Sequence, residues 1–136
     1  MIQVISGKKG SGKTKRLIDM ANAAMAQQHG DVIFLDDDNR YMFDLRHEIR
    51  FINAGDYHLL NAEMFSGFLT GMLASNFDIS VIFVDAFKKL AKNDLDSLSW
   101  FFERLEQLSQ KHSVDFVLSV SGAPEELPDF INKYAI

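Results

Sequence analysis

The sequence predicts an α/β fold in three layers (α/β/α), with helices on both faces of a mostly parallel central sheet. A β-branched run at 1–6 leads directly into a glycine-rich loop and then into an amphipathic helix. Apolar runs at 31–35, 78–85 and 114–120 are typical of strands that a parallel sheet buries on both faces. Helical patterns separate these runs, so we expect crossover connections between parallel strands.

The glycine-rich loop is the most informative segment. Residues 7–14 read GKKGSGKT and fit the phosphate-binding pattern G-x-x-x-x-G-K-[ST]. Glycines let backbone N–H groups point at phosphate oxygens, Lys13 can reach the β- and γ-phosphates, and the Thr14 hydroxyl can ligate Mg²⁺. The alternative is an ordinary glycine-rich turn before a helix. The predicted nucleotide contacts are Gly7, Lys8, Lys9, Gly10, Ser11, Gly12, Lys13, Thr14 and Lys15.

Capping and turn residues place the first half of the remaining elements. The helix that opens at Thr14 is expected to stop at His29 and Gly30, with the glycine in the C-cap role. A strand at 31–35 then ends in three aspartates. A short helix at 40–47 and a brief strand at 49–52 are predicted to follow it.

The second half is predicted in the same way. Asn61 can cap an amphipathic helix, and Asn93 or Asp94 can cap another whose apolar stripe runs from 95 to 108. Pro124 suits the first turn of a closing helix. Residues 134–136 add a short last strand in this interpretation.

A second constellation lies at the end of the strand at 78–85. Four apolar residues followed by Asp85 match the Walker B pattern, which places a carboxylate at a strand tip to hold Mg²⁺ beside the phosphates. The alternative role for Asp85 is an N-cap for the following turn. Many ATP hydrolases have Glu at the next position, where it polarises the attacking water. Here that position is Ala86.

Polar residues that end the neighbouring strands are further candidates. Asp36, Asp37 and Asp38 end a predicted parallel strand and are candidates for orienting water; the alternative is a solvated turn. Ser119 and Ser121 could sense the γ-phosphate or start the turn into the closing helix. Cationic side chains that could stabilise transferred charge, with solvated surface charge as the alternative, are Arg40, Arg46, Arg50, Lys88 and Lys89.

Composition restricts the class of protein. The 136 residues, 47% of them hydrophobic, are expected to form one domain (1–136) around one core. Without cysteine the chain has no disulfides or thiolate sites, and its four histidines lack metal-ligand spacing. The net charge of −5 makes nucleic-acid binding unlikely. No apolar run could span a membrane and the amino terminus begins as a strand, so we expect no cleavable signal and a cytoplasmic location.

With both motifs in hand, the chain resembles P-loop NTPases of the RecA/AAA type, in which an extra strand separates the phosphate-loop strand from the Walker B strand. It is similar to short stand-alone bacterial ATP-binding proteins of unassigned role. The resemblance implies that the loop glycines, Lys13 and Thr14 bind nucleotide and that Asp85 binds Mg²⁺. A weaker resemblance, to thymidine kinase, rests on Ser11 to Thr14 and on the segment 38–41; that enzyme's Asp-Glu pair and cysteine zinc lobe are missing.

Three functions follow from these observations. The first is an ATP-binding protein with slow or partner-stimulated Mg²⁺-dependent hydrolysis, in which Lys13 and Asp85 carry the catalysis. The second is a nucleotide-dependent switch or assembly module, alone as a homo-oligomer or with a protein partner. The third is a small-molecule kinase with an acceptor pocket in 36–61. ATP is favoured because no N-K-x-D segment is present to read guanine.

Overall fold

The computed structural model describes residues 1–27 and 30–136. A five-stranded sheet forms its centre, with all strand pairs parallel and the order β1-β5-β4-β2-β3. The predicted α/β class with a parallel sheet is confirmed, and β5 separates β1 from β4 as the RecA-type resemblance implies. The strands are β1 (Ile2–Gly7), β2 (Asp31–Asp36), β3 (Arg50–Asn53), β4 (Ile79–Val84) and β5 (Asp115–Ser121).

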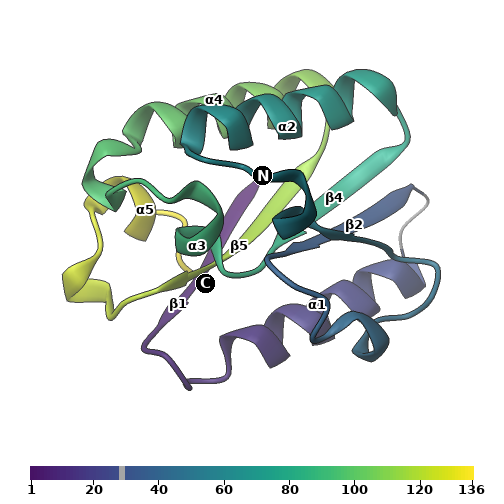
Figure 1. The fold of residues 1–136 in the computed structure, drawn as a ribbon, viewed down its shortest axis with the longest axis horizontal. Coiled ribbons are helices and arrows are strands. Elements are labelled where there is room, and N and C mark those ends of the chain that lie inside the picture. Colours follow the sequence, from purple (N-terminus) through teal and green to yellow (C-terminus); the bar gives the residue numbers. More distant parts are fainter. Residues whose placement is uncertain (28–29) are drawn as a thin grey trace.

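Helices cover both faces of the sheet (Figure 1). One face carries α1, which packs on a small core that includes Leu17, Phe34 and Phe83. The other face carries α2 and α4, which pack on the larger core that includes Phe65 and Phe87. The helices are α1 (Lys13–Gln27), α2 (Ala62–Ser75), α3 (Phe87–Ala91), α4 (Ser99–His112) and α5 (Asp129–Asn132). Within the described residues, no helix is long and apolar enough to cross a membrane.

The predicted helix at 40–47 is wrong. Only a 3₁₀ turn forms there, at Met42–Asp44. The side chain of Asn22 on α1 explains the difference, because its amide donates to the Asp44 carbonyl (3.1 Å) and its oxygen accepts the Arg46 N–H (2.8 Å). The Arg46 N–H, which a helix over 40–47 would pair with the carbonyl four residues earlier, is used instead to hold the segment against α1.

The predicted cap of the helix around 95–108 is also wrong. Asn93 accepts the Ala62 N–H at 2.7 Å and so serves the start of α2, alongside the predicted cap Asn61, which accepts from Met64. Asp94 caps only a 3₁₀ turn at Leu95–Ser97, and α4 begins later, at Ser99. The short helix α3 was not predicted, because five residues give no readable period.

The carboxyl-terminal segment differs in detail. Pro124 opens a 3₁₀ turn, and Pro128 separates it from the closing helix α5. The predicted last strand is reduced to one parallel bridge, between Val4 and Ala135, on the outer edge of β1. The predicted stop of the first helix at His29 and Gly30 falls partly outside the described residues.

Candidate nucleotide-binding site

The loop at 7–14 turns sharply between β1 and α1. Gly10 and Gly12 have φ of +84° and +90°, left-handed values that glycine adopts without strain. The Lys8 carbonyl accepts the Ser11 N–H at 3.1 Å and the Lys13 ammonium at 3.0 Å. The loop is therefore closed on itself, with the half-buried Lys13 side chain folded back over it.

Thr14 and Asp85 meet at the inner end of this loop. The Thr14 hydroxyl, in the first turn of α1, lies 3.1 and 3.3 Å from the two Asp85 carboxylate oxygens. Asp85 follows β4 directly and is 5% exposed. The two residues are 71 positions apart in the sequence and are brought together because β1 and β4 run parallel and end at the same edge of the sheet.

Ser119 holds this carboxylate in place. Its hydroxyl donates to Asp85 Oδ1 at 2.6 Å and accepts the Ala86 N–H at 3.0 Å. Ala86 has φ of +55°, a left-handed conformation that costs a residue with a Cβ about 1 kcal/mol or more. In this geometry Asp85 receives hydrogen bonds from Thr14 and Ser119, and the N-cap alternative does not describe it, because α3 has no side-chain cap.

A cleft of about 900 Å³ opens above these residues. Six of the predicted loop residues line it: Lys9, Gly10, Gly12, Lys13, Thr14 and Lys15. Gly7, Lys8 and Ser11 lie within the loop and do not line the cleft. Asp85, Ala86, Ser119 and Ser121 form its inner wall, and the lysines of α3, Lys88 and Lys89, form part of its rim.

The three aspartates after β2 do not share one environment. Asp36 is fully buried, Asp37 is partly buried, and Asp38 pairs with Arg40 at 3.5 Å. None of the three lines the cleft, although one oxygen from each lies within 4.8 Å of the others. Lys89 approaches Asp37 at 3.7 Å. The predicted solvated turn is therefore wrong for Asp36.

Asp36 is the most perturbed acid of this site. Burial raises the pKa of Asp36 to about 8, and a hydrogen bond with Asp37 and the charge of Asp85 add to the effect. Asp36 Oδ2 and Asp37 Oδ1 are buried, and neither has a hydrogen-bond partner among the described residues. Two ionised carboxylates have no hydrogen-bond donor between them. A proton on Asp36 provides the donor for a hydrogen bond between the two side chains.

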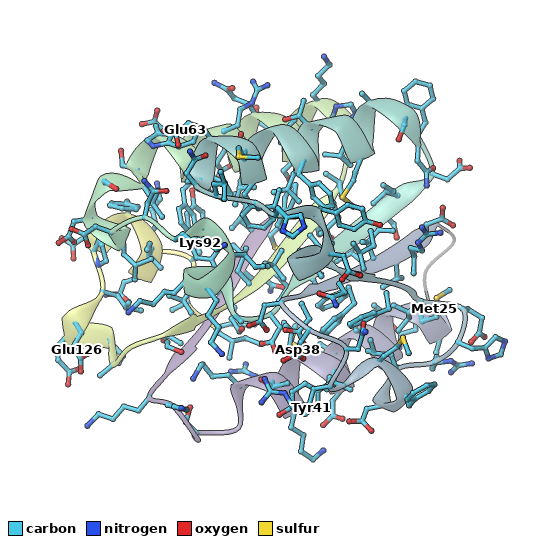
Figure 2. The ribbon with its side chains drawn as sticks, viewed as in Figure 1. Met25, Asp38, Tyr41, Glu63, Lys92 and Glu126 are labelled. Atoms are coloured by element: carbon cyan, nitrogen blue, oxygen red, sulfur yellow. The ribbon has the colours of Figure 1, made fainter. Side chains whose placement is uncertain are left out.

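Several cleft residues were missed in the sequence. Ile18, Asp19 and Asn22 extend the lining along α1, and Tyr41 and Asp44 face them from the segment after β2. Figure 2 shows Asp38 and Tyr41 near one another, on the α1 side of the molecule. The sequence did contain a signal for these α1 residues. Positions 15, 18, 19 and 22 are spaced so that they share one face of the helix, and this face leads away from the loop. Arg46 and Arg50, predicted as possible charge stabilisers, do not line the cleft.

Comparison with known proteins adds information on the fold. No protein-family model and no curated protein matches the sequence. Among solved structures, the chain is similar to the flagellar accessory protein FlaH from Methanocaldococcus jannaschii, with a TM-score of 0.61 and 14% identity. The match covers 97% of this chain and 65% of that one, so the chain spans about two thirds of that protein's length. At this identity the similarity shows the fold alone, which is α/β with a parallel sheet.

Proposed function

We propose that the chain binds a nucleoside triphosphate with Mg²⁺, in the first place ATP, and hydrolyses it slowly or when a partner stimulates it. The observation that carries this proposal is the convergence of Lys13, Thr14 and Asp85 on one end of a 900 Å³ cleft. The RecA-like fold of the FlaH neighbour supports nucleotide binding in general.

The loop offers the phosphates both donors and charge. The first N–H groups of α1 have no partner within the helix, and the positive end of the helix dipole favours an anion at this position. Lys13 is half-buried, and its ammonium donates to the exposed Lys8 carbonyl, so the ammonium can turn to a phosphate oxygen by giving up one solvent-exposed hydrogen bond. Lys9 and Lys15 add positive charge at the rim of the cleft.

The residues present also fit a magnesium ion. Mg²⁺ is held in such sites by one or two protein oxygens together with phosphate oxygens and water, and Thr14 and Asp85 supply two adjacent oxygens. The ion would supply neutralisation of the charge on the β- and γ-phosphates. Ser119 keeps the Asp85 carboxylate directed toward Thr14 through its 2.6 Å hydrogen bond, so the pair is in position before any ligand binds.

Two features support slow turnover. Position 86, directly after the carboxylate, holds an alanine and offers no base. The acid at the end of the neighbouring strand, Asp36, is buried and has a pKa of about 8, so it is mostly protonated at pH 7 and accepts no proton from water. Asp37 and Asp38 stay candidates for orienting water, from positions beside the cleft.

The same two features favour a second function, a nucleotide-dependent switch. A site that binds the triphosphate and hydrolyses it rarely would remain in the bound state until a partner acts. Such a partner, or a second copy of the chain, would supply the missing base. The exposed rim at Arg40, Lys88 and Lys89 is where such a group would approach the phosphates.

The test compares wild-type protein with Lys13→Ala in Mg·ATP binding by calorimetry and in turnover. Lys13 is only half-buried and its ammonium bonds a single loop carbonyl, so the variant should keep its fold, lose tight binding and serve as the turnover blank. Asp85→Asn should weaken binding with Mg²⁺ more than binding in excess EDTA. Equal affinity of wild type and Lys13→Ala would refute nucleotide binding at this loop, and an equal loss in both conditions would make Asp85 a structural residue only.

A further inference from the structure

The cleft extends well beyond the residues that would hold phosphate. One arm runs along α1 past Ile18 and Asn22, with Tyr41 and Asp44 as its opposite wall. At about 900 Å³ the whole cleft is near the top of the range for small-molecule sites, roughly 300–1,000 Å³. A triphosphate bound at the loop would leave this arm open to the rest of the ligand molecule, the group that carries the phosphates.

The arm is built from fixed parts. Both hydrogen bonds of the Asn22 side chain hold the backbone of the opposite wall, at Asp44 and Arg46. Tyr41 is half-buried and packs against the core under α1, so one side of the phenol is held by the protein. The Arg40 guanidinium lies 5.1 Å from the centre of the same ring.

A second groove starts from the loop on the other side of the Lys15–Asp19 ion pair. It is smaller, about 430 Å³, and Arg16, Met20 and Ala23 contribute to its lining. Among the residues that the structure describes, no aromatic ring lines this groove, whereas the arm of the cleft has the Tyr41 ring with the Arg40 guanidinium beside it. A flat aromatic ligand is therefore better accommodated in the arm.

We propose that this arm is a nucleobase subsite, in which the base of the bound nucleotide stacks at Tyr41. This inference rests on the proposed function, since the phosphate loop at the other end of the cleft fixes where the sugar and base begin. In this structure the planar Arg40 guanidinium lies over the Tyr41 ring. The same guanidinium can stack on the face of a bound base that points away from Tyr41. Stacking accepts any base, so the subsite provides affinity more than base selection.

The experiment separates the base from the phosphates by using two probes, Mg·ATP and Mg·tripolyphosphate, in calorimetric titrations. Tyr41→Ala should lower affinity for ATP by roughly 5- to 150-fold, because stacking on an aromatic side chain contributes about 1–3 kcal/mol. Its affinity for tripolyphosphate should stay unchanged. Tyr41→Phe should behave like wild type. Tyr57→Ala is the matched control, since that tyrosine is 56% exposed and lies outside the cleft.

Tyr41 contacts the core, so Tyr41→Leu provides a second variant that keeps apolar packing while removing the ring. It should show the same selective loss for ATP. Wild-type protein that binds tripolyphosphate as tightly as ATP would overturn the subsite, and so would equal losses for both probes in the Tyr41 variants. Wild-type protein that binds neither probe would instead refute the proposed function itself, and the subsite with it.

Discussion

Replacement of Asp36 by Asn should stabilise the protein, by an amount that grows with pH. Asp36 is fully buried, and its pKa is raised from the ordinary 3.8 to about 8. Between pH 4 and pH 8 the unfolded chain releases this proton while the folded chain keeps it, so rising pH favours unfolding. Above pH 8 both states are ionised and the penalty is constant. Asn keeps the shape of the protonated acid, and its amide can donate to Asp37 as the acid does.

The expected size follows from the two pKa values. At about 1.36 kcal/mol per pKa unit, the full penalty is roughly 6 kcal/mol at most, and it accumulates at about 1.4 kcal/mol per pH unit across this window. The difference in the free energy of unfolding between Asp36→Asn and wild type should therefore be near zero at pH 4 and reach several kcal/mol at pH 8.

Urea denaturation from pH 4 to 8.5 measures this difference, and the single tryptophan, Trp100, reports unfolding by fluorescence. Asp38→Asn is the matched control because it lies on the same segment, its side chain is 48% exposed, and Asn preserves the oxygen that accepts the Arg40 N–H. Its stability relative to wild type should change little with pH. A flat difference for Asp36→Asn, or a less stable variant at pH 8, would refute the assignment of a buried, protonated acid.

Two further predictions concern other parts of the fold. Ser119→Ala should cost about 1–3 kcal/mol of unfolding free energy and lower the affinity for Mg·ATP, because it removes the hydrogen bond that holds Asp85; unchanged values in denaturation and calorimetry would contradict this. Gly55→Ala should cost about 1–3 kcal/mol, since a Cβ there would lie 2.5 Å from the Asp37 carbonyl oxygen. Gly67→Ala, on α2 with open space around it, should instead raise the melting temperature slightly, and equal effects of the two glycine variants would count against the close contact.

The sequence predicted what depends on local pattern. The strand, loop and helix around residues 7–14 depend on glycines and apolar spacing within a short window, and so does the position of Asp85 at the end of an apolar strand. The parallel sheet followed from the alternation of strands and helices. The α3 helix was missed because it lies between two left-handed residues, Ala86 and Lys92, in a segment too short to show a period.

What the sequence did not reveal depends on contacts between distant residues. Ser119 is directed at Asp85 because β4 and β5 are neighbours in the sheet, a fact that no local window contains. Three consecutive aspartates are typical of a solvated turn, yet the first is the last residue of β2, which lies between β4 and β3, and it is fully buried. The predicted helix at 40–47 was prevented by a single side chain, Asn22, which lies on another element.

The charges around the cleft bear on how hydrolysis would be controlled. The position that commonly carries a base holds Ala86, and the acid that ends the neighbouring strand, Asp36, is buried, which raises its pKa to about 8. In the proposed function, the wall beside Asp85 would hold the triphosphate without supplying a base, while the lysines at the rim, Lys88 and Lys89, are exposed. If a second copy of the chain completes the site, turnover per molecule must rise with protein concentration. If hydrolysis depends only on residues of one chain, it must stay constant, so a dilution series of the turnover assay separates the two cases.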